Sequence, residues 1–155
     1  MPESKEQNLD HLAATRAVDM SLVVAGDVTP EKAETILNKA LGVVTESGPF
    51  ACGVFLLTRC GSGRGKSTAE EATATATLRA LLRFGDAEWF QALQPRFDCT
   101  VRDFDVHSRP AKKLVVDHLL KISAQPLEKL LLVQKAWEQS LTYARHIVRA
   151  QREKP

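Results

Sequence analysis

Hydrophobic residues recur at steps of three and four along most of the chain, which is the spacing of amphipathic α-helices. The first such pattern covers residues 5–25, and Gly26 closes it. Thr29 and Pro30 then supply an N-cap and a first-turn proline, which predict a second helix that runs to about Glu46. The chain is therefore expected to begin with two helices joined by a short connection.

The most apolar stretch, residues 41–57, is interrupted by the sequence Ser47-Gly48-Pro49. Glycine readily ends a helix, and the fixed φ of Pro49 suits the first turn of the next one. Small side chains at positions 51–53 would let a neighbouring helix approach closely. The stretch predicts a buried helical hairpin at the centre of the domain.

A further helix is expected after the glycine-rich segment that follows this hairpin. Ser67 and Glu70 have the spacing of a capping box, and the helix they open is predicted to reach about Phe84. The alternation of Ala and Thr over residues 72–77 would suit a strand, but the length of the pattern and its flanking residues favour a helix. A short helical turn is expected over residues 86–93.

The second half of the chain contains a loop and two helices. Residues 96–109 are predicted to be a loop packed down by its aromatic side chains, and a helix follows from about Pro110. His118, on an otherwise apolar face, is interpreted as a partly buried core residue. The longest helix is expected over residues 126–152. Its predicted inward positions are Leu127, Leu130, Leu131, Ala136 or Trp137, Leu141, Ala144 and Val148.

This pattern predicts an all-α fold, a compact helical bundle of about six helices in a single domain over residues 1–155. The composition, with 44% hydrophobic and 26% charged residues, is ordinary for a globular protein. The apolar runs are shorter than a membrane span and the N-terminal residues lack a signal-peptide core, so a cytoplasmic protein without membrane contact is expected. The odd number of cysteines, three, favours reduced thiols.

Charge is distributed unevenly although the net charge is only +2. Residues 1–58 carry four basic and eight acidic side chains, whereas residues 59–83 carry five basic and two acidic. Residues 126–155 carry six basic and three acidic side chains. This asymmetry suits a surface that binds a polyanion, and ordinary solvated helix faces are the alternative interpretation.

The basic residues near the glycine-rich segment and on the last helix are the candidate binding residues. Guanidinium groups can fork onto phosphate oxygens, so these residues would bind a nucleic-acid backbone rather than read its bases. Steps of four and three place the last three of them on one helix face. The candidates are Arg59, Arg64, Lys66, Arg79, Arg83, Arg145, Arg149 and Arg152.

The segment Gly61–Ser67 resembles a nucleotide-binding P-loop but lacks part of that motif. Gly65-Lys66-Ser67 matches its end, while Cys60 occupies the position of its first glycine. A P-loop protein also needs a parallel sheet, for which the sequence offers one candidate strand. Nucleotide binding therefore remains an alternative, and a flexible basic loop explains the same residues.

The sequence contains no metal-ligand spacing among its cysteines and histidines, and no constellation of nucleophile and base. We therefore expect a protein that is not an enzyme and that needs no metal or cofactor.

Two stretches resemble the small helical subunit of type III-B CRISPR RNA-guided (Cmr) effector complexes. In residues 43–57 a helix break is followed by an apolar helix, and this family has a mid-run glycine before a leucine-rich helix in the corresponding segment. In residues 135–150 a leucine, an aromatic residue, an arginine and an alanine stand much as in the family. These four residues are Leu141, Tyr143, Arg145 and Ala150.

The resemblance implies a non-catalytic subunit that stacks along the duplex of guide RNA and target RNA and contacts the RNA backbone. Its protein partners would be other subunits of the effector complex and copies of itself, and the neighbouring backbone subunits would cut RNA. A helical protein–protein interaction module without nucleic acid is the remaining alternative.

Overall fold

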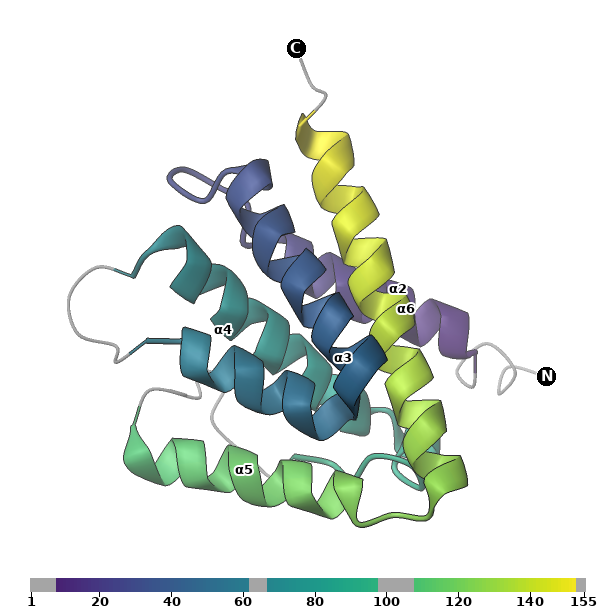
Figure 1. Cartoon of the computed structure of the whole chain (residues 1–155). Helices are drawn as coiled ribbons and strands as arrows, with labels where there is room; N and C mark the ends of the chain where they lie inside the picture. The colour runs from purple at the N-terminus through teal and green to yellow at the C-terminus, as the bar shows by residue number, and fades with distance from the viewer. Residues whose placement is uncertain (1–7, 62–66, 98–107, 153–155) are drawn as a thin grey trace.

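The computed structural model describes residues 8–61, 67–97 and 108–152, and within these ranges it is helical with no β-strand (Figure 1). The expected all-α fold class is confirmed, and these ranges contain five α-helices where about six were predicted for the chain. The elements are α2 (Leu9–Ser21), α3 (Pro30–Arg59), α4 (Ala69–Leu82), η1 (Arg83–Asp86), η2 (Glu88–Phe90), α5 (Arg109–Ser123) and α6 (Leu127–Arg152).

α3 is bent back on itself at the predicted break. Gly48 has φ 90° and ψ 178°, a non-helical conformation inside the element, and Pro49 follows it directly. The thiol of Cys52 donates a hydrogen bond to the carbonyl of Ala40 at 3.6 Å, although twelve residues separate them. The two arms of α3 therefore form the expected helical hairpin (Figure 1). No loop separates the arms, which is why two predicted helices form one continuous element.

The N-terminal caps follow local sequence chemistry, with one shift of register. Thr29 caps α3 as predicted, by accepting a hydrogen bond from the backbone N–H of Lys32. The capping box of α4 consists of Thr68 and Glu71, whose side chains each accept the other residue's backbone N–H, at 3.1 and 2.9 Å. The prediction of Ser67 and Glu70 was wrong by one residue, because both pairs have the same spacing.

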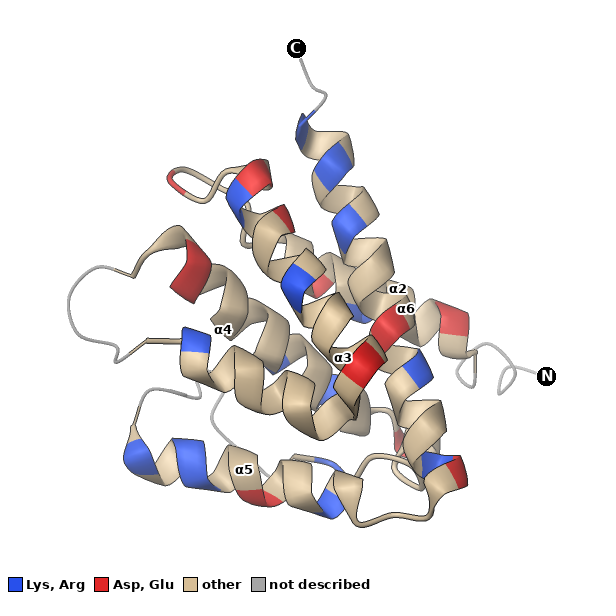
Figure 2. Cartoon of the chain, viewed as in Figure 1, with Lys and Arg blue, Asp and Glu red and all other residues tan. Residues whose placement is uncertain are grey.

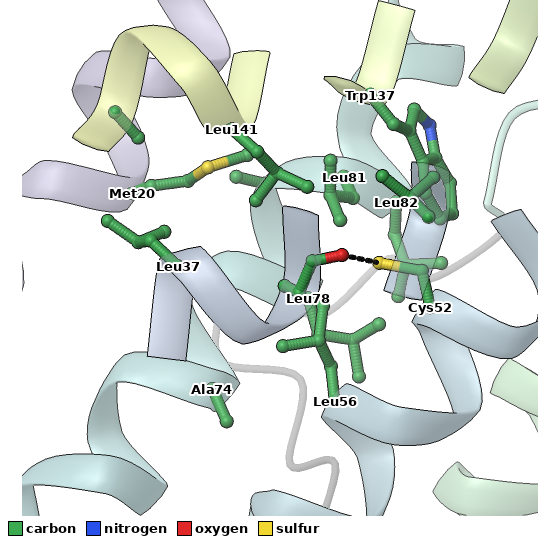
Figure 3. Close-up of a cluster of buried hydrophobic side chains, with 14 of the residues drawn as sticks. Met20, Leu37, Cys52, Leu56, Ala74, Leu78, Leu81, Leu82, Trp137 and Leu141 are labelled. Carbon is green, nitrogen blue, oxygen red and sulfur yellow. Dashed lines mark hydrogen bonds between the residues drawn. The ribbon is translucent and has the colours of Figure 1, made fainter. Parts of the chain in front are cut away.

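The core lies where the hairpin of α3 meets α2, α4 and α6 (Figure 3). Met20 of α2, Leu37 and Leu56 from the two arms of α3, Leu78 of α4 and Trp137 of α6 are each at most 1% exposed. Burying side chains of this size drives folding, because each removes a large apolar area from water. α3 is therefore the central element of the bundle.

α5 covers the second arm of α3 at very close range. A Cβ atom on Gly53 would lie 2.5 Å from the δ-carbons of Leu119, so any larger residue would force the Leu119 side chain to move. This confirms the predicted role of a small residue at this position. His118, next along α5, is 5% exposed, as expected for a core histidine.

The segment after α4 forms the 3₁₀ turns η1 and η2 in place of the short helical turn predicted over residues 86–93. Gln94 follows them and is completely buried. Its side-chain amide donates to the carbonyl of Leu81 at 2.8 Å and accepts from the indole N–H of Trp137 at 2.9 Å. This glutamine therefore joins the end of α4 to α6 inside the core.

Two predicted core positions at the start of α6 were wrong. Leu127 and Leu131 are 68% and 51% exposed, and the buried side chains in this part of the helix are Val133, Ala136 and Trp137. Apolar residues at 127 and 130–133 surround the first turns, so their periodicity does not select a face. Packing against the other helices selects it instead.

α3 is long and apolar enough to cross a membrane by length and composition, a test that the core helix of a soluble protein also passes. Residues 30–47 alone carry five charged side chains, so the apolar 18-residue window has to include Gly48. In this structure the chain reverses direction at that glycine. α3 is thus a folded hairpin at the centre of the bundle rather than one straight apolar rod.

Candidate nucleic-acid interface

The predicted binding residues occupy three separate places. Arg145, Arg149 and Arg152 lie along the C-terminal half of α6, and Arg59 ends α3. Arg79 is on α4 and Arg83 begins η1. Arg64 and Lys66 lie outside the described residues.

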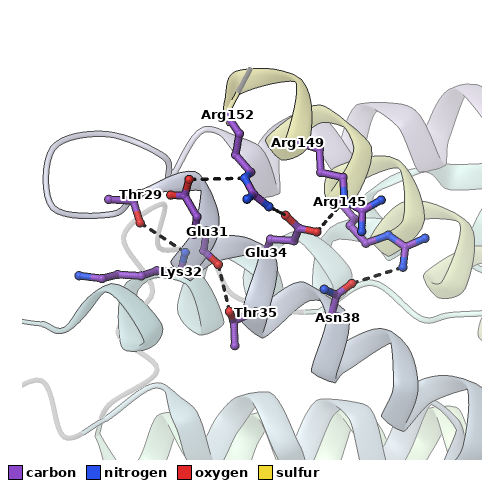
Figure 4. A network of polar contacts seen from close by, with 9 residues as sticks. All are labelled: Thr29, Glu31, Lys32, Glu34, Thr35, Asn38, Arg145, Arg149 and Arg152. Carbon is purple, nitrogen blue, oxygen red and sulfur yellow. Dashed lines mark hydrogen bonds and ion pairs between the residues drawn. The ribbon is translucent and has the colours of Figure 1, made fainter. Parts of the chain in front are cut away.

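The arginines of α6 face the acidic first arm of α3 (Figure 4). Arg149 Nε donates to Glu34 Oε2 at 2.6 Å, and Arg152 Nη1 donates to Glu34 Oε1 at 3.0 Å. Arg152 Nε also lies 3.4 Å from a carboxylate oxygen of Glu31. Arg145 donates to the side-chain amide oxygen of Asn38 at 3.3 Å. One face of α6 is thus held against α3 by polar contacts.

Glu34 is the centre of this network, because both Arg149 and Arg152 donate to its carboxylate. Its side chain is only 8% exposed. The hydrogen bond from Arg149 holds the pKa of the Glu34 carboxyl below its usual value, and Arg152 acts in the same direction, while burial opposes them. Two carboxylates and two guanidinium groups balance in charge here. A phosphate binding to these arginines would compete with an almost buried carboxylate, so this face is a poor anion site.

Arg83, directly after α4, also has acidic neighbours. Arg83 lies 3.2 Å from the carboxylate of Asp86 and 3.6 Å from that of Asp19 on α2. Arg16 is 3.5 Å from the same Asp19, and burial lowers the pKa of its guanidinium despite that neighbour. Arg79 is partly buried. Asp19 thus links Arg16 of its own helix to Arg83 of η1, and Arg83 has two carboxylate neighbours although its side chain is 55% exposed.

A different set of cations gathers where α3 ends and α5 begins, which Figure 2 shows as blue bands at one end of the molecule. We call this set, Arg59, Arg109, Lys112 and Lys113, the basic end. The guanidinium of Arg59 lies over the ring of Phe55, 4.9 Å from its centroid. Within the described part of the chain, none of the four cations has an ion-pair partner.

The backbone at this end adds to the positive potential. α5 has 15 residues, and its N-cap Ser108 accepts the backbone N–H of Ala111 at 3.2 Å. The remaining N–H groups of a helix N-terminus carry partial positive charge and favour anions. The charge of Lys112 acts to lower the pKa of the buried Cys60 thiol, against the larger effect of burial. The first turns of α5 therefore lie beside the end of α3.

Three members of the basic end were missed in the sequence, namely Arg109, Lys112 and Lys113. The available signal was three cations within five positions at the start of a helix. The net charge of this region does not indicate them, because residues 84–125 carry six basic and six acidic side chains. Arg109, Lys112 and Lys113 stand together because they occupy the first turns of one helix, α5.

Reactive groups are scarce in the described part of the chain. Burial raises the pKa of the Cys52 thiol to about 12 and also raises that of Cys60, so both thiols are kept protonated. No group of three or more metal-ligating side chains occurs among the described residues. Residues 62–66 of the segment Gly61–Ser67 lie outside them, and Gly61, the first residue of that segment, has φ 81°.

No protein-family model, curated protein or solved structure matches this chain.

Proposed function

We propose that this chain is a non-catalytic helical subunit of a type III CRISPR RNA-guided effector complex, and that it contacts RNA phosphates through the basic end. The family resemblance of residues 43–57 and 135–150 supports the class of complex. These stretches lie at the turn and second arm of the α3 hairpin and in α6, the elements that build the core.

The observation that carries RNA contact is that the four cations of the basic end have no ion-pair partner among the described residues. Arg59, Arg109 and Lys113 are exposed, and they converge with Lys112 from two helix ends that are distant in sequence. Cations without carboxylate partners are free to displace the counterions of a phosphate backbone, which supplies affinity for RNA of any sequence. The arginines of α6 would serve the fold instead.

In the proposed setting the protein is cytoplasmic and works without a metal or cofactor of its own. Its partners are the backbones of guide RNA and target RNA, other subunits of the complex and copies of itself. RNA cleavage would belong to neighbouring subunits.

RNA binding measured at several salt concentrations tests the role of the basic end. We expect Arg59→Ala/Lys112→Ala/Lys113→Ala to weaken binding to both single-stranded and duplex RNA. Each lost phosphate contact should reduce the slope of log affinity against log salt by about one. The matched control, Lys32→Ala/Lys39→Ala/Lys129→Ala, removes the same charge from exposed positions elsewhere and should retain the original slope.

Equal slopes for the two triple variants would refute RNA contact through the basic end, and no RNA binding by the parent chain would favour the protein–protein interaction module. Nucleotide binding through Gly61–Ser67 has less support, because the described residues contain no strand of the parallel sheet that a P-loop requires.

A further inference from the structure

The first two turns of α6 carry an exposed stripe that the bundle does not use. Glu128, Leu131, Leu132 and Lys135 follow one another at helical steps of three, one and three, so they share a face. All four are exposed, with Leu131 at 51% and Leu132 at 46%. The side chains that attach this part of α6 to the core, such as Val133, lie on the opposite side.

The two leucines stand out against the rest of this outward face. Farther along α6 the same face continues with Thr142, His146 and Arg149, which are polar. Large apolar side chains that are contiguous and rimmed by charge are typical of protein contact sites. The stripe is therefore a candidate interface, and its charges indicate which partner it fits.

We propose that this stripe pairs two copies of the chain, with their α6 helices antiparallel about a twofold axis. The stripe has the order acid, leucine, leucine, base, and its midpoint lies between Leu131 and Leu132. A twofold axis through that midpoint places Leu131 of one copy against Leu132 of the other. The same axis places Glu128 of each copy opposite Lys135 of the other, so that one such pair lies at each end of the stripe.

The order of charges selects a second copy of this chain as the occupant. An antiparallel copy supplies a base opposite each acid and an acid opposite each base, which is the self-complementarity of an isologous contact. A parallel copy would set Glu128 against Glu128 and Lys135 against Lys135, and like charges repel. Within the described part of the chain, neither residue has another ion-pair partner.

This contact gives a surface to the self-association that the proposed function includes, and it does not depend on RNA contact or on an effector complex. α6 begins beside the C-terminal end of α5, while the basic end lies at α5's N-terminus, so the two surfaces are apart (Figure 1). A twofold contact also closes after two copies and does not by itself extend a filament. Because two helical turns bury far less than the roughly 1,200–2,000 Å² of a stable interface, we expect a weak, concentration-dependent dimer.

Charge exchange at the stripe tests the pairing by sedimentation equilibrium of the full chain. Glu128→Lys or Lys135→Glu alone should weaken self-association about tenfold, because each change turns both ion pairs into repulsions. Mixing these two variants should restore dimers, since every base then faces an acid again. The double variant Glu128→Lys/Lys135→Glu should likewise regain the original association.

Two further variants complete the design. Leu131→Ser/Leu132→Ser should remove association while circular dichroism shows the helical content unchanged, and Lys129→Glu, a charge reversal beside the stripe, should associate normally. A chain that stays monomeric up to about 1 mM would overturn the proposal, because contacts weaker than that supply only about 4 kcal/mol. Failure of the mixture to recover, or association indifferent to these changes, would also overturn it.

Discussion

Arg149 of α6 donates its Nε–H to the nearly buried carboxylate of Glu34 on α3, at 2.6 Å. The two residues are 115 positions apart in the sequence. This pair, together with Arg152, fixes the C-terminal half of α6 along the first arm of α3 (Figure 4). A basic helix face that was predicted to bind RNA is thus engaged by the protein's own carboxylate.

Changes at this pair should destabilise the fold. We expect Arg149→Glu to lower the free energy of unfolding by about 1–3 kcal/mol, because it sets a second carboxylate against the almost buried one. Lys135→Glu, the same charge reversal at an exposed position of α6, should change stability by less than about 0.5 kcal/mol. Urea unfolding measures both values, and equal stabilities would show that Glu34 does not hold α6.

The buried amide of Gln94 should be sensitive to removal as well. Gln94→Leu keeps a side chain of similar size but leaves the indole N–H of Trp137 and the carbonyl of Leu81 without that partner. We expect a loss of about 1–3 kcal/mol, since unsatisfied buried polar groups keep their desolvation cost. Gln134→Leu, on a half-buried glutamine of α6, is the control and should cost less.

A shift in the urea midpoint without a change in slope would identify the Gln94 effect as a change in folded-state stability. An unchanged midpoint for Gln94→Leu would mean that both freed groups find other partners.

Local chemistry made much of the fold predictable. A glycine followed by proline favours a helix break through local chemistry alone, and Gly48-Pro49 supplies one here. The N-cap Thr29 was predictable too, because its hydroxyl oxygen and the backbone N–H of Lys32 that it accepts are only three residues apart. The capping box of α4 was misplaced since Thr68 and Ser67 each have a glutamate three residues on, and spacing does not choose between them.

The candidate interface was less predictable because charge compensation acts across space. Nothing near Arg149 in the sequence indicates that Glu34 will neutralise it. The cations at the start of α5 become a cluster only when α5 packs beside Arg59 through the contact of Leu119 with Gly53. Leu131 belongs to an apolar run that surrounds the helix, so its exposure depends on which face the other helices cover.

The hairpin turn gives a prediction with an internal control. Gly48 has φ 90°, and a Cβ atom there would meet nothing within 4 Å, so substitution costs only backbone strain. We expect Gly48→Ala to destabilise by about 1–2 kcal/mol. Gly42, on the first arm of the same element, also has open space around it and lies in regular helix.

Gly42→Ala should therefore stabilise the protein by about 0.5–1 kcal/mol, the helix propensity difference between the two residues. Opposite signs in thermal unfolding are the expected result. Stabilisation by Gly48→Ala would show that the turn in solution does not use the left-handed conformation.

The last prediction concerns pH and His118, whose ring packs edge-on against Phe97 at 5.1 Å between centroids. Its Nε2 is buried without a hydrogen-bond partner among the described residues. Burial, with a smaller contribution from Lys121, lowers the pKa of His118 from 6.5 to about 4. The folded state therefore excludes a proton that the unfolded chain binds.

Since the unfolded state binds more protons in this window, stability should fall as the pH decreases from 6.5 towards about 4. The slope should be at most about 1.4 kcal/mol per pH unit. Glu34, whose pKa is lowered from 4.5, adds a further loss only below that pH, when its carboxylate becomes protonated. His118→Leu should flatten the first part of the profile between pH 6.5 and 4.5, whereas His146→Gln, at an exposed position of α6, should keep it. Urea unfolding at pH 6.5 and at pH 4.5 measures this difference. Equal stability of the parent protein at these two pH values would mean that His118 accepts its proton without disturbing the core.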